Sequence, residues 1–525
     1  MSTPSDRLPA SQTGFDPEAV AQQMLDFNAP SVETVEPSLP AQKASVYVDE
    51  SPSPPPGSRP ERRLPHDLTD RANAELFASM YGGKFRYVDG NGWYSWDGVR
   101  WKLRGGENAA IWAAGDMAAQ MPTKDPSGVF SPQEVVRHRR YSSSTSGMKA
   151  MLHQAKASPA LSLDASQLDG DAYTLCTPDG VVDLRTGQLR AADPSRDFNS
   201  RCTRVAPSVR MDTPRFYRFL IDTFGDDADG KKMIDYLHVL LGYSITGDVG
   251  AQVLPFCHGD GANGKSVLLD LVVQILGDYA HAAPPGFLMD RGGYNEHSTE
   301  LTELYGRRLV VCSELKATDR FNEVRMKQLT GGEPVTARRM RQDYFTFPPT
   351  HHLWLLGNHY PEVATGGHAF WRRLRLIPFE HKIPDDKKID NLARILVEEE
   401  GPGILAWLIE GSRRFLATRA PGADRDNLDG PKRVRTAKAA YEATEDHIGR
   451  FLSDATEKKP DEKVLQSRLH RIYKSWCVGE EVKPASSRAF ADRVRKELGL
   501  KSAEEMIKSN GVRFYPGLLL RDGHE

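Results

Sequence analysis

The chain has 525 residues, of which 27% are charged and 39% are apolar, and its formal net charge is −2. This length corresponds to roughly three or four domains, and the composition is typical of a globular protein. No apolar run approaches the ~18 residues of a membrane-spanning helix, so we expect no membrane protein. The near-neutral net charge excludes a uniformly basic nucleic-acid binder, but it does not exclude a local basic surface.

The N-terminus and the cysteines indicate the cellular compartment. Residues 1–10 lack the basic region and the apolar stretch of a secretory signal. The five cysteines lie far apart and form no CxxC pair, which argues against a disulfide framework and against a structural zinc site. A reducing cytoplasm is therefore expected. The cysteines are Cys176, Cys202, Cys257, Cys312 and Cys477.

The first segment, residues 1–66, is a tail rich in proline and serine. Residues 1–65 hold 12 of the 35 prolines and carry a net charge of −4. Such a segment cannot bury enough apolar surface to offset the entropy of ordering, so we expect disorder. A short partner-binding helix over residues 16–27 is the alternative to a plain tail.

Residues 67–210 are predicted to form a mixed α/β accessory domain. Turn residues between aromatic strand formers predict a hairpin over 87–96. Helical patterns cover 107–121 and 132–156, and tight turns divide 173–189 into short strands.

The remaining chain divides into four parts. Apolar residues at helical spacing over 213–246 predict a helical collar at 211–250. From 251 to 420, apolar strands alternate with helices, which is the pattern of an α/β domain. A charged linker is expected at 421–445, and 446–525 is a small basic domain.

The strongest motif is GDGANGKS at residues 259–266, which satisfies the phosphate-loop pattern GxxxxGK[ST] in full. Glycines let the backbone N–H groups point at phosphate oxygens. Lys265 should neutralise the β- and γ-phosphates, and the Ser266 hydroxyl should bind Mg²⁺. The apolar runs 253–257 and 267–276 supply the required strand and helix, which argues against a chance glycine-rich turn. ATP and Mg²⁺ are the expected cofactors, and the nucleotide contacts are Gly259, Asp260, Gly261, Ala262, Asn263, Gly264, Lys265, Ser266 and Val267.

Two further strands end in polar residues that suit phosphate chemistry. A phosphate-loop NTPase needs a carboxylate near Mg²⁺ at the end of a neighbouring strand, and Glu314 follows the apolar strand 309–312. It could hold Mg²⁺ through water or polarise the attacking water. Asn358 follows the strand 353–357 and could orient that water. A helix-capping glutamate and an ordinary turn asparagine are the alternatives.

Residues 370–375 contain three arginines. The guanidinium group suits the charge on a transferring phosphoryl group and often comes from a neighbouring subunit. A solvated basic turn is the alternative. The three candidates are Arg372, Arg373 and Arg375.

Residues 329–347 predict two strands around a basic tip that contains Arg338, Arg339 and Arg341. Over 305–345 the net charge is +4. A basic loop that projects from an ATPase core could bind a phosphate backbone. A surface hairpin without a ligand is the alternative.

The order of these motifs resembles the superfamily III helicases, in particular the phage and plasmid primase-helicases related to the poxvirus primase-helicase. The resemblance is carried by GxGxNGKS, an apolar strand followed by SE, LTGGE with ARR, LLGNxxP and FWRRLRLIPF. It covers residues 210–385 strongly and extends weakly to 180–187. It implies an AAA+ P-loop ATPase core, a ring that is usually a hexamer, and 3′→5′ unwinding coupled to ATP hydrolysis.

The resemblance also implies roles for single residues. Lys265 would bind ATP, Glu314 would be the acid of the second motif, and Asn358 would be the sensor. Arg373 or its neighbour Arg372 would be the arginine finger that completes catalysis. The hairpin would place Arg338, Arg339 and Arg341 near the ring channel, where they contact single-stranded DNA.

The sequence departs from the family pattern in two places. His368 stands where an acid is expected ahead of Trp-Arg-Arg, which leaves the identity of the finger open. The region before the ATPase is too short and too rich in proline for a full primase domain. We therefore predict a helicase without primase.

Residues 446–525 are expected to form a winged-helix domain. Helical patterns over 447–478 and 488–498 precede a hairpin at 510–518, and the net charge over 463–513 is +6. The charge favours DNA as the ligand over a protein, which is the alternative. The expected DNA contacts are Arg488, Arg493, Arg495 and Lys496.

Together these features predict an ATP-dependent DNA helicase of phage or plasmid replication. It would act as a homo-hexamer on single-stranded and forked DNA in the cytoplasm of a bacterial host, with a separate primase or replication protein as a candidate partner. Two alternatives stay open. One is a DNA-binding initiator or scaffold that uses nucleotide for assembly only, and the other is an RNA-directed NTPase.

Overall fold

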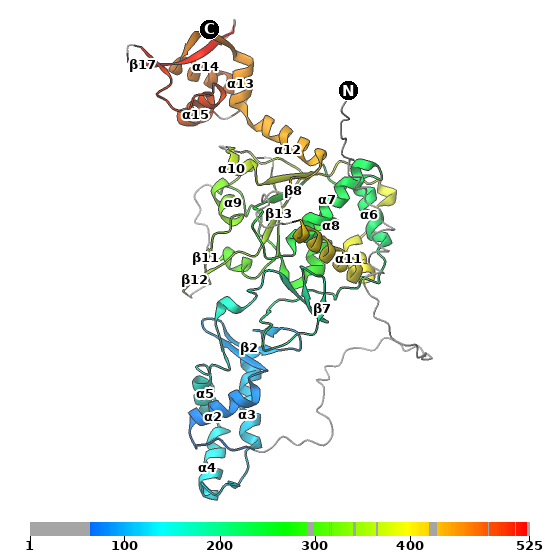
Figure 1. The fold of residues 1–525 in the computed structure, drawn as a ribbon, viewed down its shortest axis with the longest axis vertical. Coiled ribbons are helices and arrows are strands. Elements are labelled where there is room, and N and C mark those ends of the chain that lie inside the picture. Colours follow the sequence, from blue (N-terminus) through cyan, green and yellow to red (C-terminus); the bar gives the residue numbers. More distant parts are fainter. Residues whose placement is uncertain are drawn as a thin grey trace, which may run out of the picture. The chain divides into compact units, whose positions relative to one another are not determined.

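The structure is a computed structural model in which the chain folds as two units, Met1–Leu168 with Ala192–Ser200 and Asp169–Ala191 with Arg201–Glu525 (Figure 1). None of the described helices is long and apolar enough to cross a membrane. The candidate helix at 16–27 and most of the predicted tail lie outside the described residues. The structure describes residues 63–291, 299–313, 315–316, 318–339, 343–363, 366–418, 428–480, 482, 484–509 and 511–521.

In the described part of the first unit, four α-helices pack with a four-stranded sheet of order β3-β2-β1-β4. The predicted hairpin is confirmed, since β1 pairs with β2 in antiparallel register. Phe77, Phe85 and Trp93 lie at the centre of its core. The elements are α2 (Asp70–Tyr81), β1 (Phe85–Val88), β2 (Gly92–Trp96), β3 (Trp101–Lys102), α3 (Gly106–Gln120), α4 (Pro132–Ser142), α5 (Thr145–Ala155) and β4 (Ser162–Leu163).

The helical pattern predicted over 132–156 is confirmed, and the structure divides it into two helices, α4 and α5. The Ser144 side chain accepts a hydrogen bond from the backbone N–H of Gly147 at 3.1 Å, which starts a new helix at that point. Gly147 also packs so closely that a Cβ would lie 2.3 Å from the carbonyl oxygen of Tyr141. A cap and a close backbone approach therefore break the helical pattern.

The second unit begins with the short strands predicted over 173–189, which the structure confirms. They form an antiparallel sheet of order β5-β6-β7. The strands are β5 (Thr174–Thr177), β6 (Gly180–Asp183) and β7 (Leu189–Arg190).

A five-stranded parallel sheet of order β14-β8-β13-β10-β9 forms the centre of the second unit. It confirms the α/β pattern predicted from residue 251 onward. Strands covered on both faces carry continuous apolar runs, and for this reason these strands could be predicted from the sequence. The strands are β8 (Leu254–His258), β9 (Ala280–Ala282), β10 (Leu309–Cys312), β13 (His352–Gly357) and β14 (Leu374–Pro378).

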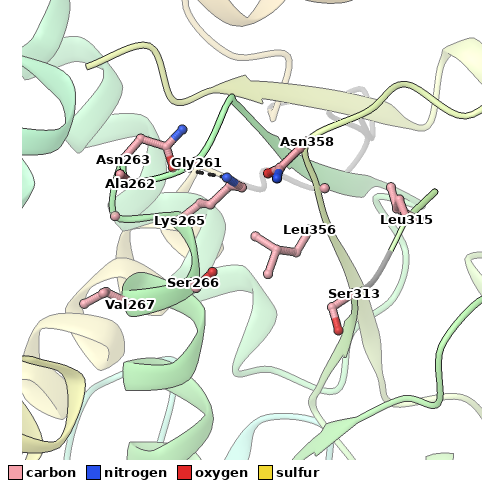
Figure 2. Close-up of a pocket in the computed structure, with 12 residues that line it drawn as sticks. Gly261, Ala262, Asn263, Lys265, Ser266, Val267, Ser313, Leu315, Leu356 and Asn358 are labelled. Carbon is pink, nitrogen blue, oxygen red and sulfur yellow. Dashed lines mark hydrogen bonds between the residues drawn. The ribbon is translucent and has the colours of Figure 1, made fainter. Parts of the chain in front are cut away.

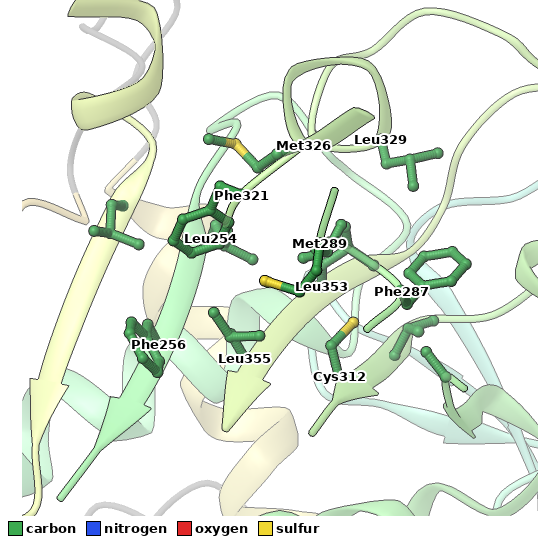
Figure 3. Close-up of a cluster of buried hydrophobic side chains, with 14 of the residues drawn as sticks. Leu254, Phe256, Phe287, Met289, Cys312, Phe321, Met326, Leu329, Leu353 and Leu355 are labelled. Carbon is green, nitrogen blue, oxygen red and sulfur yellow. The ribbon is translucent and has the colours of Figure 1, made fainter. Parts of the chain in front are cut away.

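On one face of this sheet, buried side chains from strands and loops form one apolar cluster (Figure 3). Leu254 and Phe256 come from β8, and Leu353 and Leu355 come from β13. Helix α9 (Glu323–Leu329) and the antiparallel pair β11 (Val335–Arg338) and β12 (Tyr344–Phe347) pack against the same cluster. The two predicted strands of this hairpin are confirmed.

Helices α7 (Ala228–Ser244), α8 (Lys265–Leu276) and α11 (Leu392–Ala417) pack together in the second unit (Figure 1). The collar predicted over 213–246 is two helices, because Gly225, with φ +103°, ends α6 (Pro214–Phe224). Where α7 crosses α11, a Cβ on Gly242 would lie 2.1 Å from the carbonyl carbon of Gly411.

Helix α12 (Lys432–Glu445) occupies much of the segment predicted as a linker at 421–445. Val434 and Tyr441 are buried, and the helix packs against β14. This part of the segment is therefore packed structure rather than a solvated connector.

The C-terminal part combines three helices with a sheet of order β15-β17-β16. The predicted helix after Ser486 and the predicted hairpin are confirmed. A strand, β15, was missed, because its sequence TEKKPDEKVL is mostly polar and its hydrogen-bonding partner, β17, lies about 50 residues away. The elements are α13 (His447–Ala455), β15 (Thr456–Leu465), α14 (Gln466–Gly479), α15 (Ser487–Glu497), β16 (Ile507–Ser509) and β17 (Val512–Leu520).

Candidate nucleotide-binding site

The phosphate-loop motif connects the end of β8 to the start of α8. Gly261 and Gly264 have φ values of +101° and +85°, and Ala262 has +50°. Gly264 is the N-cap residue of α8, so no capping side chain hydrogen-bonds to the start of this helix. The first N–H groups of α8 therefore remain available to an anion, together with the positive end of the helix dipole.

Close packing makes glycine necessary at two loop positions. A Cβ on Gly259 would lie 2.2 Å from Asn263 Nδ2 and 2.3 Å from the carbonyl oxygen of Phe379. A Cβ on Gly264 would lie 2.9 Å from Thr223 Oγ1. The loop thus packs closely against both α6 and the segment that follows β14.

Lys265 is buried, and its ammonium group folds back onto the loop. Nζ donates to the carbonyl oxygen of Gly259 at 2.8 Å and to Asn263 Oδ1 at 3.3 Å. Burial lowers the pKa of Lys265, while Cys257 and Asp260 act in the opposite direction. Asn263 is itself held, since its Nδ2 donates to the Phe379 carbonyl oxygen at 2.8 Å.

The loop and two strand ends surround a cavity of about 450 Å³ (Figure 2). Lys265 and Ser266 line it from the loop, and Ser313 and Asn358 line it from the ends of β10 and β13. The volume lies within the usual range for small-ligand sites. In a parallel sheet, ligands bind at the carboxyl ends of the strands, and the cavity lies at these ends.

The structure therefore brings together Lys265, Ser266 and Asn358 of the predicted site. Glu314 follows Ser313 directly but lies outside the described residues. The hydroxyl of Ser266 is an oxygen donor of the kind that Mg²⁺ prefers, so the described residues fit a metal–nucleotide ligand.

The three candidate arginines do not line this cavity. Arg375 is 2% exposed, and its Nε donates to the carbonyl oxygen of Leu428 at 2.8 Å. Arg373 is 7% exposed and bonded to three side-chain or backbone oxygens of its own chain. Arg372 is less buried, and its Nη2 donates to Gln252 Oε1 at 2.5 Å.

An aromatic stack beside the loop was not found from the sequence. The Tyr360 ring lies between His258 and Tyr441, with centroid distances of 3.8 and 4.5 Å. His258 directly precedes the phosphate loop, and burial lowers its pKa. On α12, Glu445 Oε2 accepts from the backbone N–H of Val363 at 2.8 Å. Helix α12 is thus bonded to the segment that follows Asn358.

The basic hairpin presents arginine and aromatic side chains together. The Arg338 guanidinium lies 5.2 Å from the centre of the Tyr344 ring, and Arg339 lies 4.9 Å from that of Phe345. The Tyr344 ring is 63% exposed. Arg341 lies outside the described residues.

The four predicted DNA contacts near the C-terminus differ in their surroundings. Arg488 and Lys496 are exposed on α15. Arg493 pairs with Asp446 at 2.6 Å and with Glu497 at 3.0 Å. Arg495 pairs with Asp492.

Three family models match separate parts of the chain. A model described as D5 N terminal like matches residues 74–225, and one described as Poxvirus D5 protein-like matches residues 443–503. Between them, a family of unknown function (DUF5906) matches residues 257–373, which include the phosphate loop.

Curated viral proteins resemble parts of the chain. "Putative helicase L207/L206" of Acanthamoeba polyphaga mimivirus is 31% identical over 216 residues, covering 41% of this chain and 22% of the relative. "Putative helicase 121R" of Invertebrate iridescent virus 3 is 23% identical over 372 residues, covering 65% of this chain and 39% of the relative. The chain thus spans well under half the length of these relatives.

Among solved structures, the apo A form of the NrS-1 C-terminal region matches 61% of this chain and 80% of that one. The identity is 15% and the TM-score is 0.35.

Proposed function

We propose that this chain, which belongs to the D5-like primase-helicase family, is an ATP-dependent DNA helicase. The family assignment confirms the resemblance drawn from the motif order. The names of the relatives suggest a replication enzyme of the helicase or primase class. ATP hydrolysis coupled to DNA unwinding is the finer statement proposed for this chain.

The observation that carries the proposal is the cavity shared by the phosphate loop and the end of β13. Positive-φ backbone, an uncapped helix start and a buried lysine are the three features that binding of a polyphosphate needs. Asn358 lines the same cavity as Lys265. We propose that its side-chain amide orients a water molecule toward the terminal phosphate. A passive anion site would not need that amide.

In the proposed mechanism, the loop N–H groups and Lys265 Nζ hold the phosphates. The Ser266 hydroxyl with Glu314 would hold Mg²⁺, which would supply neutralising charge on the phosphate oxygens. Asn358 orients the attacking water. An arginine from a neighbouring protomer of a hexameric AAA+ ring stabilises the charge that develops.

Of the candidate fingers, Arg372 is favoured over Arg373. A finger must reach out of its own protomer, and Arg373 is buried with each guanidinium nitrogen bonded internally. Arg372 is more accessible and shares one acceptor, Gln252, with Arg373. Arg338, Arg339 and Arg341 are proposed to bind single-stranded DNA in the channel, and a separate primase or replication protein remains a candidate partner.

The test is Lys265→Ala, measured as phosphate release with and without single-stranded DNA. We expect DNA-stimulated turnover to be lost while the circular dichroism spectrum and the thermal midpoint stay close to those of the wild type. Lys232→Ala, which removes an exposed lysine on α7, is the matched control and should keep wild-type turnover. A Lys265→Ala variant with normal turnover would refute the proposal.

The alternative of an initiator or scaffold predicts a different result for the wild-type protein. Such a protein would bind nucleotide and DNA but release almost no phosphate. The basic C-terminal part, together with a nucleotide cavity, is the observation that keeps this alternative open. A competition between single-stranded DNA and RNA for stimulation of turnover tests the RNA-directed alternative.

A further inference from the structure

One face of α14 carries exposed basic residues without any acid. The exposed residues of this face, apart from the terminal Gly479, are Ser467, Arg468, Arg471, Lys474, Ser475 and Val478. At 100° per residue they fall within an arc of about 120° on the helix. The 14 residues of α14 include no aspartate and no glutamate, so no acid within the helix offsets these three cations.

The orientation of this face is fixed by the opposite side of the helix. Leu469, Tyr473 and Cys477 are each 0% exposed and belong to the core that α14 shares with α13, α15 and β17. The hydroxyl of Tyr473 also accepts from the backbone N–H of Ala485 at 2.8 Å. The basic face is therefore held toward solvent by the packing of this region.

The charges on α14 differ from those on α15. Among the residues that the structure describes, Arg468, Arg471 and Lys474 form no ion pair. By contrast, Arg493 and Arg495 of α15 pair with Asp446, Glu497 and Asp492, and Glu497 also pairs with Lys458 at 3.1 Å. Ion pairs such as these reduce the charge that α15 offers to a ligand.

A second feature of the same region suits a polyanionic partner. Lys508 on β16 lies directly opposite Arg513 on β17, and both residues are exposed. Like charges placed opposite each other destabilise a strand pair. A negatively charged ligand would relieve that repulsion.

We propose that the outward face of α14 binds the phosphate backbone of duplex DNA. Arg468, Arg471 and Lys474 pair with phosphates, and Ser467 and Ser475 donate hydrogen bonds to them. The face as defined contains no aromatic side chain on which unpaired bases could stack, which favours a duplex over a single strand. Val478 is its only large apolar residue, whereas the core of a protein interface is usually rich in aromatic residues.

The inference rests on the proposed function only in taking DNA as the ligand, and it does not require ATP hydrolysis. The test uses the full chain with the triple variant Arg468→Gln, Arg471→Gln and Lys474→Gln. Binding to a labelled 20-base-pair duplex of mixed sequence is measured by fluorescence anisotropy over a series of KCl concentrations. With three phosphate contacts removed, the slope of log affinity against log salt should fall by about 2 to 3, and the affinity at low salt should fall about tenfold or more.

The matched control is the double variant Arg488→Gln and Lys496→Gln on α15, which should change the slope less than the triple variant. Unchanged duplex binding by the triple variant at every salt concentration overturns the inference, and it then leaves a protein partner as the ligand of this face. A larger loss with the α15 variant also overturns it. Phosphate release with and without single-stranded DNA is measured in parallel. If the wild type releases none under either condition, while duplex binding still depends on α14, the helicase proposal fails and this inference stands.

Discussion

Arg373 donates a hydrogen bond from Nε to Thr330 Oγ1 over 3.1 Å, and this bond joins the start of β14 to the end of α9. Its Nη2 also donates to Gln252 Oε1 at 3.2 Å, two residues before β8. Thr330 directly precedes the glycines that lead into the basic hairpin. One guanidinium group therefore connects the root of the hairpin to two strands beside the phosphate loop.

The neighbouring arginines should consequently give different phenotypes. Arg373→Ala leaves buried acceptors without a donor, so we expect a loss of roughly 2–3 kcal/mol in unfolding free energy. Arg372→Ala should leave the unfolding free energy within about 1 kcal/mol of the wild type and should lower turnover instead. Urea unfolding and steady-state ATP hydrolysis on the two variants make the comparison. A stable Arg373→Ala protein that has lost turnover would identify Arg373 as the finger.

Asn263 should control the position of the catalytic lysine. Its Oδ1 accepts from Lys265 Nζ, and its Nδ2 holds the Phe379 carbonyl oxygen, so Asn263→Ala frees the ammonium group and loosens the loop. We expect KM for ATP to rise about tenfold, which corresponds to about 1.4 kcal/mol of lost binding. Asn322→Ala, which removes the half-buried capping side chain of α9, is a control for loss of an amide elsewhere. An unchanged KM would contradict this role.

His238 should make the protein less stable in mild acid. Burial, with Arg414 nearby, lowers the pKa of His238 to about 3 from its ordinary value near 6.5. In the unfolded chain, His238 takes up a proton as the pH falls below about 6.5. In the folded chain, His238 does so only near pH 3. Stability is therefore fully present above pH 6.5 and falls as the pH drops, by roughly 2 kcal/mol between pH 7 and pH 5 from this residue.

The measurement is urea unfolding of His238→Gln at pH 7 and pH 5. The glutamine amide can still donate to the Trp407 carbonyl oxygen, which His238 Nε2 contacts at 2.7 Å. The difference in stability between the two pH values should shrink by about 2 kcal/mol relative to the wild type. His381→Gln, at an exposed position, is the control and should leave that difference as it is. An unaltered pH dependence in the His238 variant would count against the assignment.

The crossing of α7 and α11 should tolerate no side chain at Gly242. Because a Cβ there would lie 2.1 Å from a backbone carbon of Gly411, the two helices must separate. We expect Gly242→Ala to lower the unfolding free energy by roughly 3 kcal/mol or more. Gly479→Ala is the control, since a Cβ at that helical position meets nothing within 4 Å. A thermal melt that shows equal midpoints for the two variants would disprove the argument.

The sequence predicts the parallel sheet well, because its strands are buried on both faces and carry continuous apolar runs. The phosphate loop is readable for a different reason: several glycines, a lysine and a serine at fixed spacing are required by backbone geometry. Asn358 was identified because it ends a strand, and the strand order then brings it to the same cavity as Lys265.

Features that depend on distant partners were missed. The strand β15 is visible only once β17 pairs with it, and Pro460 lies within the irregular part of that pairing. The stacking of Tyr360 on His258 joins residues about 100 positions apart, and no local pattern marks it. The hydrogen bonds that Arg373 makes within its own chain could not be predicted either. An arginine finger and a buried structural arginine both appear in the sequence only as an arginine beside a strand.

The burial of the five cysteines has a practical consequence for experiments that follow conformational change with a fluorescent label. All of them are buried, and burial raises the pKa of Cys312 to about 12 and also raises that of Cys257. Maleimide reagents attack accessible thiolates, so the native chain should react slowly with them. A single cysteine introduced at the exposed Val478 could then carry a fluorophore without removal of any native thiol.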